Sequence, residues 1–237
     1  MNIVVVWRGR SDAKAGEFAR RYGWRAAAGG IKPRQAGLVL SKRFDADAIR
    51  RCLAAPFAGG VEVDRGGTLL LGGRFRSHLA AGGLGLSLRT DTAYHCEAAR
   101  LFVDALCQRF AAHWAGGLEL AVHEVVANGL IHGNLGLRSC GPGADDFVEY
   151  CRSLDDLLAH PKLIRRRLEV SAAPTPEGLE VAVRDEGAGY DPEAVRHEAV
   201  DPVRLHGLAV ASAAARVAVE DCGRCTVLAF PRDGGAE

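Results

Sequence analysis

Hydrophobic and polar residues form alternating blocks along the first 60 or so residues, and these blocks predict strands and helices in turn. Apolar runs typical of buried strands lie at residues 3–6, 37–40 and 60–63. Apolar residues at helical spacing predict one helix that is capped by Ser11 or Asp12 and ends near Tyr22. Asp45 is the expected cap of a second helix, which ends near Ala54. This β-α-β-α-β order predicts a small parallel sheet.

The pattern changes from residue 85 onward and predicts a sheet rich in antiparallel strands. The expected elements are a strand at 85–90, a long helix capped by Asp91 or Thr92 with apolar residues at 99, 102, 103, 106 and 110, a helix at 119–134, irregular polar chain over 137–163 with a short helix near 154–158, a hairpin at 168–184, a helix at about 204–216, and a closing hairpin at 217–230. Together they predict an α/β fold, with one mixed sheet and one layer of helices in this half.

Glycine-rich chain near residues 64–73 separates two expected domains, a small α/β domain over 1–75 and a larger one over 85–237. With 237 residues, 48% of them hydrophobic and 25% charged, the chain is expected to bury an ordinary globular core. A net charge of +1 gives no reason to expect nucleic acid or an anionic membrane as a partner. No window reaches the roughly 18 apolar residues of a membrane span, and the first apolar run is too short for a signal peptide, so we expect a cytoplasmic protein.

Seven scattered cysteines do not indicate a disulfide framework. Cys222 and Cys225 form the one close pair, which is open to two interpretations. A CxxC sequence suits a redox motif or half of a zinc site, but no second such pair or HxxxH sequence accompanies it. The turn residues favour a hairpin bend at Gly223, which we take as the main prediction.

The helix expected at 119–134 carries a polar row, in which Glu124, Asn128 and His132 are four residues apart. At 3.6 residues per turn each step of four drifts by only about 40°, so the three side chains share one face. A carboxylate, an amide and an imidazole are costly to bury without partners. The row therefore suits a site that needs a proton acceptor, a metal ligand and an anion contact. A zinc-protease helix is excluded because Ala127 stands where that motif requires a second histidine.

Two glycine-containing motifs follow. In Asp185-x-Gly187-x-Gly189, a carboxylate at a strand end can accept a hydrogen bond from an exocyclic amine, and the glycines allow a flat ligand to approach the backbone. Gly207, near the start of a helix, offers free N–H groups to phosphate. Taken alone, the first motif is more often an ordinary turn and the second an ordinary helix start.

In this order the three segments resemble the N box and the two glycine boxes of the Bergerat-fold ATPases, a superfamily that includes DNA gyrase, a class of heat-shock chaperones, histidine kinases and the mismatch-repair ATPases. The resemblance covers residues 85–233. Within the superfamily, the chain is most similar to the anti-sigma factor serine/threonine kinases. The features that carry this similarity are Glu124, Asn128 and His132-Gly133, the short interval from Asp191 to Gly207, and the closing segment 226–231. The resemblance implies a Bergerat two-layer α/β sandwich that binds ATP and Mg²⁺.

At the phosphate end, the resemblance implies that Glu124 is the general base, that Asn128 coordinates Mg²⁺, that His132 approaches the phosphates or the lid, and that Gly207 presents N–H groups to phosphate. At the other end, it implies that Asp185 receives the adenine amino group, that Gly187 and Gly189 shape the adenine pocket and lid hinge, and that Thr226 supports adenine. Such an arrangement fits phosphoryl transfer, in which positioning and charge neutralisation provide most of the catalysis.

The implied function is an anti-sigma-factor-type protein kinase that phosphorylates a serine or threonine of a protein partner, such as an anti-sigma factor antagonist or a sigma factor, and that forms a homodimer. The family usually has a glycine where this chain has Leu205, two positions before Gly207. The alternative is therefore a nucleotide-binding or protein-interaction switch that lacks catalysis. A sensor histidine kinase is disfavoured, because no H-box helix precedes the ATPase region. The long segment 137–163 is expected to cover the site or to form a partner surface.

Residues 1–75 resemble a shortened receiver domain of the two-component kind. A receiver carries a phospho-accepting aspartate at a strand end, where this chain has Ser41-Lys42, and no acidic pair follows the first strand. We therefore expect a regulatory or docking domain that is not phosphorylated.

Overall fold

The computed structural model describes residues 2–8, 12–27, 31–32, 35–63, 69–110, 117–141, 143–190 and 210–232. The strands of these residues are β1 (Asn2–Trp7), β2 (Arg25–Ala26), β3 (Gln35–Ser41), β4 (Phe57–Glu62), β5 (Leu84–Arg89), β6 (Arg167–Pro174), β7 (Gly178–Arg184), β8 (Arg216–Glu220) and β9 (Cys225–Pro231). The helices are α1 (Asp12–Arg21), α2 (Ala46–Leu53), α3 (Gly73–Ala80), α4 (Thr90–His95), α5 (Ala98–Phe110), α6 (Leu118–Asn128) and α7 (Ala144–Ala159), with a π-helix η1 (Gly129–Asn134) and the 3₁₀ turns η2 (Leu163–Arg165) and η3 (Asp221–Gly223).

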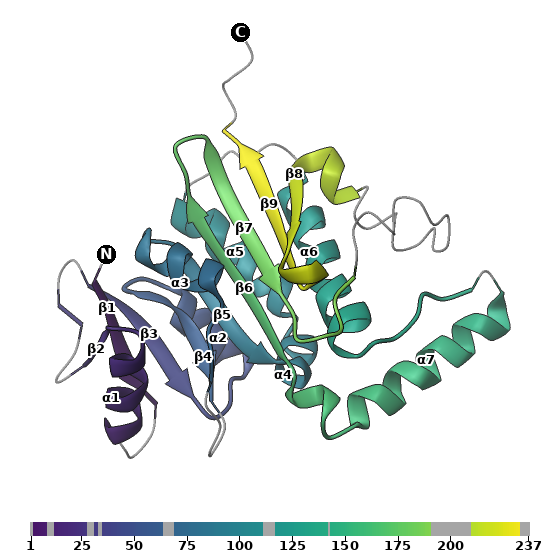
Figure 1. Ribbon diagram of the computed structural model, residues 1–237, viewed down its shortest axis with the longest axis horizontal. Coiled ribbons are helices and arrows are strands. Elements are labelled where there is room, and N and C mark those ends of the chain that lie inside the picture. The colour runs from purple at the N-terminus through teal and green to yellow at the C-terminus, as the bar shows by residue number, and fades with distance from the viewer. Residues whose placement is uncertain are drawn as a thin grey trace, which may run out of the picture.

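The described strands form one nine-stranded mixed sheet in the order β2-β1-β3-β4-β5-β6-β7-β9-β8 (Figure 1). Strands β1 to β5 pair in parallel, and β5 to β9 pair antiparallel. The parallel pairing was predicted for three of these strands, β1, β3 and β4. The α/β class is thus confirmed. Because β4 pairs directly with β5, the sheet runs without a break across the boundary expected between the two domains. The division into domains over 1–75 and 85–237 stays a prediction.

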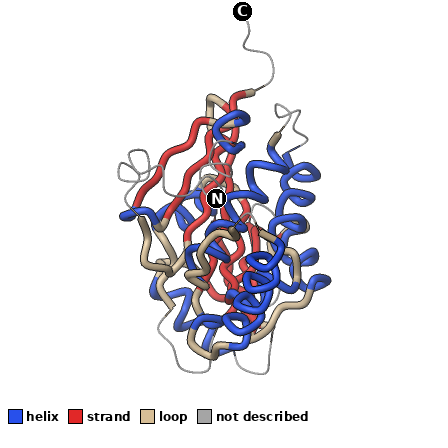
Figure 2. Tube along the Cα trace, turned by 90° about the vertical axis from the view of Figure 1, so that its right-hand side faces the viewer, coloured by secondary structure: helices blue, strands red, loops and turns tan. Residues whose placement is uncertain are grey.

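Helices cover both faces of the sheet, and Figure 2 shows the strands running up the middle of the molecule with helices beside them. On one face, α2 packs against β4, and α5 and α6 pack against β6 and β7. On the other face, α1 packs against β1 and β2, and α3 packs against β5 and β6. No helix within the described ranges combines the length and apolar character needed to cross a membrane.

Several local predictions are confirmed. Asp45 caps α2, where its Oδ1 accepts a hydrogen bond from the Ala48 N–H at 2.7 Å. The apolar residues predicted to face the core from the long helix lie in α5. Of these, Ala99, Phe102, Val103 and Leu106 are buried. Both expected hairpins are present, as β6–β7 and β8–β9. Residues 210–214 are helical, in agreement with the helix expected at about 204–216, of which residues 204–209 lie outside the described part.

Strand β4 begins earlier than predicted, at Phe57 rather than Gly60. Glycines lower the strand propensity of this segment, which is why the apolar pattern alone misplaced its start. Their role is tertiary, because a Cβ on Gly59 would collide with the carbonyl of Gly85 on β5. A glycine is therefore required where these two strands approach each other.

The single long helix predicted after Asp91 or Thr92 is wrong, since the chain forms α4 and α5 instead. Glu97, between them, has φ of +50°, a left-handed conformation that interrupts the helical hydrogen bonds. The capping prediction is also wrong. Helix α4 already begins at Thr90, so that Asp91 lies in its first turn rather than at its cap.

The segment predicted to be irregular also differs. Residues 144–159 form the 16-residue helix α7 rather than a short helix near 154–158. None of its side chains is buried, and Figure 1 shows α7 extending away from the sheet. The apolar residues of this segment recur at helical spacing, but the acidic residues between them led to the prediction of an irregular polar chain.

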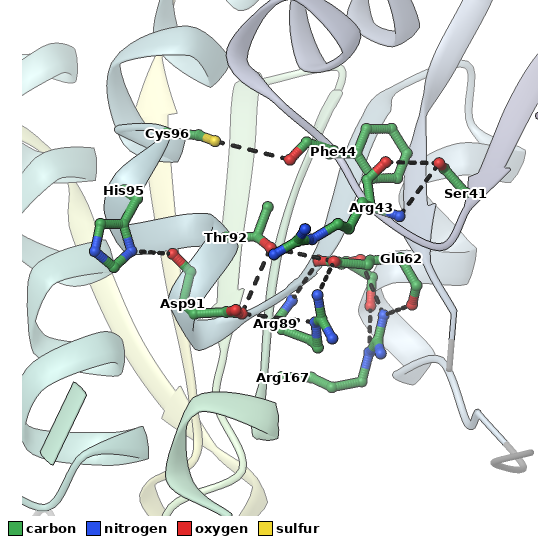
Figure 3. Close-up of polar contacts among 11 residues, drawn as sticks. Ser41, Arg43, Phe44, Glu62, Arg89, Asp91, Thr92, His95, Cys96 and Arg167 are labelled. Carbon is green, nitrogen blue, oxygen red and sulfur yellow. Dashed lines mark hydrogen bonds and ion pairs between the residues drawn. The ribbon is translucent and has the colours of Figure 1, made fainter. Parts of the chain in front are cut away.

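A buried carboxylate fastens β4 to the strands and helix beside it (Figure 3). The Glu62 side chain is only 1% exposed and lies 2.7 Å from Arg89 Nη2. It also accepts hydrogen bonds from the Arg89 N–H and the Thr92 hydroxyl, each at 3.1 Å. Arg167, on β6, donates to the backbone carbonyls of Glu62 and Ser87. Burial raises the pKa of Glu62, so this charge depends on its partners.

We expect Arg89→Met to lower the free energy of unfolding by about 3 kcal/mol at neutral pH, because it leaves the Glu62 carboxylate buried beside an apolar group. Urea denaturation measures this change. Adding Glu62→Gln to Arg89→Met removes the charge and should restore part of the loss. Arg50→Met breaks an exposed ion pair with Asp47 and serves as the control, with an expected change below about 0.5 kcal/mol. Equal effects of Arg89→Met and Arg50→Met would show that the buried pair is unimportant.

Candidate functional site

A cavity of about 300 Å³ lies between η1, the carboxyl end of β7 and strand β9. Segments far apart in the sequence converge on it, and five of the predicted site residues contribute to its lining: Asn128, His132, Asp185, Gly189 and Thr226. The volume is at the lower end of the range typical for small-molecule sites. The structure therefore brings Asn128 and His132 of the polar row, the first glycine motif and the closing strand to one place.

The remaining predicted residues are placed differently. Gly187 lies in the loop beside the cavity, where a Cβ would collide with the carbonyl of Gly133. Glu124 is half-buried on α6, four residues before Asn128, and does not contribute to the cavity lining. Gly207 lies outside the described residues, as does Leu205.

The polar row runs across a change of helix type. We predicted one α-helix over 119–134, but α6 gives way at Gly129 to the π-helix η1, in which the Leu135 N–H donates to the carbonyl of Leu130 at 2.9 Å. Asn128 and His132 nevertheless both line the cavity, in agreement with the predicted shared face, whereas Glu124 does not. A π-helical turn inside an α-helix frequently marks a functional site.

His132 is oriented by its own segment. Its Nδ1 lies 2.6 Å from the carbonyl oxygen of Leu137, which can only accept, so that Nδ1 carries the hydrogen. In the neutral imidazole this leaves Nε2 as a hydrogen-bond acceptor. His132 thus lines the cavity with a defined tautomer.

Close packing of η1 against the loop after β7 explains Gly133 but not Gly129. A Cβ on Gly133 would lie 2.5 Å from Asp185 Cγ, closer than any real contact. A Cβ on Gly129 would lie 3.0 Å from Leu168 Cδ1, which is the flexible end of a side chain. Gly133 is therefore the residue that allows the Asp185 carboxylate to sit directly against the helix.

Asp185 itself is buried at the end of β7. Its N–H donates to the Arg224 carbonyl at 3.0 Å, and its Oδ1 accepts from the Gly187 N–H at 2.7 Å. Burial raises the pKa of Asp185 to about 6, against the lowering effect of the Gly187 hydrogen bond and of nearby arginines. A carboxyl group at the wall of a cavity, with one oxygen already engaged, suits recognition of a ligand N–H group.

Asn134 is a residue that sequence reasoning did not identify. It is fully buried, its Nδ2 donates to the Arg167 carbonyl at 3.0 Å, and its Oδ1 accepts from the Glu186 N–H at 2.8 Å. The Arg167 N–H donates in turn to Glu186 Oε2 at 2.9 Å. These bonds join η1, β6 and the loop after β7. Asparagine at the end of the helix was visible in the sequence, but its burial was not.

Arg166 was also missed, because it is one of many arginines in the chain. It lines the cavity, and its Nη1 donates to the Asn134 carbonyl at 2.7 Å. This fixes a guanidinium at the cavity wall, where it can contact an anion.

The turn of the β8–β9 hairpin closes one side of the cavity, and the predicted hairpin with a bend at Gly223 is confirmed. The Tyr190 N–H donates to the Cys222 carbonyl at 3.1 Å, which attaches the loop after β7 to this turn. Gly189 (φ +74°) and Gly223 (φ +84°) both adopt left-handed conformations at this contact.

Among the described residues no group of three His, Cys, Asp or Glu side chains is placed to hold a metal ion.

No family model matches the chain in a scan against known protein families, and a search of curated proteins finds no matching relative. Its function is therefore inferred from the geometry and chemistry of the cavity.

The pKa of Asp185 predicts a pH-dependent stability. The pKa is about 6 in the folded state and 3.8 in the reference state, so the folded protein binds this proton more tightly. The resulting stabilisation is fully present below about pH 4 and is lost as the pH rises through 6. As the pH rises through this window, we expect the unfolding free energy of the wild type to fall relative to that of Asp185→Asn. Urea denaturation at a series of pH values measures it, and a constant difference would contradict the prediction.

Proposed function

We propose that the cavity binds ATP with Mg²⁺, and that the chain is a cytoplasmic protein kinase of the anti-sigma-factor type. The observation that carries this proposal is the buried Asp185 carboxyl group in a cavity that is also lined by Asn128 and Thr226. The resemblance to the Bergerat-fold ATPases predicted Asn128, Asp185 and Thr226 as contacts of the nucleotide and its metal, whereas Gly207 of the second glycine box lies outside the described residues. The meeting of these three residues at one cavity supports the proposal.

The wall around Asp185 suits adenine. The carboxylate can accept a hydrogen bond from the exocyclic amino group. Thr226 is paired with Val183 across β9 and β7, and both line the cavity beside it. Gly189 lines the cavity too, where its missing side chain makes room for the Cys222 carbonyl.

The opposite wall suits phosphate and Mg²⁺. Asn128 offers an amide oxygen and Arg166 a fixed positive charge, and the His132 imidazole is held beside them by its Nδ1. Mg²⁺ is commonly held by one or two protein oxygens together with substrate phosphates, so a site with few protein ligands fits it. When bound, the ion would neutralise charge on the phosphates.

In the proposed reaction, Glu124 accepts the proton of a serine or threonine hydroxyl on the partner protein. The hydroxyl oxygen forms a bond to the γ-phosphorus, the bond from that phosphorus to the β–γ bridging oxygen breaks, and ADP leaves. Glu124 lies one helical turn from Asn128 on α6, which brings the base close to the residue proposed to contact the metal.

The second candidate function is a switch that binds nucleotide and a protein partner without transferring phosphate. The observation that favours it is that Glu124 does not contribute to the cavity lining. The departure at Leu205 from the family pattern also supports it.

We expect the wild type to bind ATP in the presence of Mg²⁺, measured by isothermal titration calorimetry. Asp185→Asn should weaken binding by about tenfold or more, because the Gly187 N–H holds the amide oxygen and leaves the NH₂ group facing the adenine amine. Asp156→Asn, an exposed change on α7, should bind as the wild type does. Failure of the wild type to bind ATP at millimolar concentration would refute both nucleotide functions.

We expect Glu124→Ala to abolish phosphate transfer while ATP binding is kept, because the base acts only on the incoming hydroxyl. Asn128→Ala should instead weaken Mg²⁺-ATP binding. Transfer of labelled phosphate from ATP to a candidate anti-sigma factor antagonist measures the reaction, and Glu119→Ala, an exposed change on the same helix, is the control. Unchanged transfer in Glu124→Ala would refute the role of the base, whereas ATP binding without transfer in the wild type would favour the switch.

A further inference from the structure

Helix α7 carries a regular apolar stripe. Its members recur at helical spacings of three and four residues: Phe147, Tyr150, Cys151, Leu154, Leu157 and Leu158. We call these six residues the α7 stripe. This spacing places them on one side of the helix and matches the seam positions of a two-helix coiled coil.

The described residues cover this stripe only in part. Phe147 is 59% exposed, whereas the other five residues of the stripe are half-buried. Among the described elements, α7 packs mainly against the short turn η2, and Figure 1 shows most of its length projecting from the body. An amphipathic helix derives most of its stability from packing its apolar face, so a stripe that is half covered and ends in an exposed Phe147 leaves apolar surface for a further contact.

The charge of α7 restricts what can cover the stripe. The helix carries five acidic residues, Asp145, Asp146, Glu149, Asp155 and Asp156, and one basic residue, Arg152, which gives a net charge of −4. At about 100° per residue, Asp146 and Asp155 lie beside the stripe, whereas Asp145, Glu149 and Asp156 lie on the opposite side of the helix. The two acidic flanks disfavour an anionic lipid surface, and they disfavour a second copy of α7 because like charges would face each other. A helix with basic residues beside its apolar positions is complementary.

The position of α7 connects the stripe to the cavity. The chain enters α7 from Gly136, which lines the cavity, and it returns through η2 to Arg166, which lines it too. The segment that carries α7 is thus attached at both ends to residues of the cavity, which gives a protein bound on α7 a physical connection to it.

We propose that the α7 stripe is the docking surface for an amphipathic, basic-flanked helix of a partner protein. The further assignment of that partner as the protein whose hydroxyl is phosphorylated rests on the proposed kinase function. In this arrangement the apolar stripe provides affinity, and the acidic residues select the partner and set its orientation.

The direct test uses two synthetic helical peptides with the same leucine seam, one with lysine and one with glutamate at the flanking positions. Binding to the full-length protein is measured by fluorescence anisotropy without nucleotide, so that failure to bind ATP does not affect the result. We expect the lysine peptide to bind more tightly than the glutamate peptide, and its affinity to fall as salt is added. Equal binding of both peptides, or of neither, would overturn the proposal.

Variants separate docking from folding. Phe147→Ser should weaken binding of the lysine peptide by about tenfold or more, because it removes the most exposed apolar residue of the stripe. Leu120→Ser, at an exposed apolar residue on α6, should leave binding unchanged. Asp155→Lys should reduce the preference for the lysine peptide while circular dichroism shows an unchanged helix content. A preference that survives Asp155→Lys, or equal loss in Leu120→Ser, would contradict the assignment.

Two other occupants of the stripe give distinct results. Self-association would appear as a dimer in sedimentation equilibrium that Phe147→Ser dissociates, and this outcome would overturn the proposal in favour of a second copy. If residues 191–209 of the same chain covered the stripe, deletion of these residues would strengthen peptide binding, and weak binding by the intact chain would likewise count against a partner helix.

Discussion

The side-chain amide of Asn134 is the contact on which the cavity depends. It is fully buried, and its donor and acceptor atoms hold β6 and the loop after β7 at once. A buried amide that lost either partner would carry a desolvation cost of about 1–3 kcal/mol, so the three segments are favoured in one arrangement. That arrangement places the Asp185 carboxyl group against Gly133, which forms the wall of the cavity. The polar site thus follows from a structural hydrogen-bond network as much as from the residues proposed to contact a ligand.

The same network continues into the first half of the chain. Arg167 accepts the Asn134 hydrogen bond with its carbonyl and holds the Glu62 carbonyl with its guanidinium, while the Glu62 carboxylate is fixed by Arg89. Strand β4 is therefore connected to the cavity through β6 by consecutive polar contacts rather than by apolar packing alone. Contiguous contacts of this kind can carry energetic coupling, although contiguity by itself does not demonstrate it. They give residues 1–75 a physical route to the site, which a regulatory or docking domain would need.

The sequence predicted those features that short-range patterns determine. Apolar runs located most strands, and Asp45 was recognised as a cap because its role involves only neighbouring residues. The break at Glu97 and the change to a π-helix at Gly129 were missed, because each replaces a regular helix with a geometry that periodicity does not report. In the site, the motif residues around Asp185 were found, whereas Asn134 and Arg166 were not. Their significance lies in partners on other segments, and one sequence does not reveal which segments meet.

The position of Glu124 outside the cavity lining bears on both candidate functions. A base for protein phosphorylation must meet a hydroxyl that arrives on another protein, so it is useful at the rim of a nucleotide cavity rather than inside it. Glu124 is half-buried, lies outside the cavity lining and stands one turn from Asn128, which lines it, and this is compatible with such a place. A switch without catalysis would permit the same position but would not require it. The difference between a kinase and a switch then depends on the partner. A protein bound beside the cavity through α7 that brings a hydroxyl to Glu124 makes the site catalytic, and one that does not makes it a sensor of bound nucleotide.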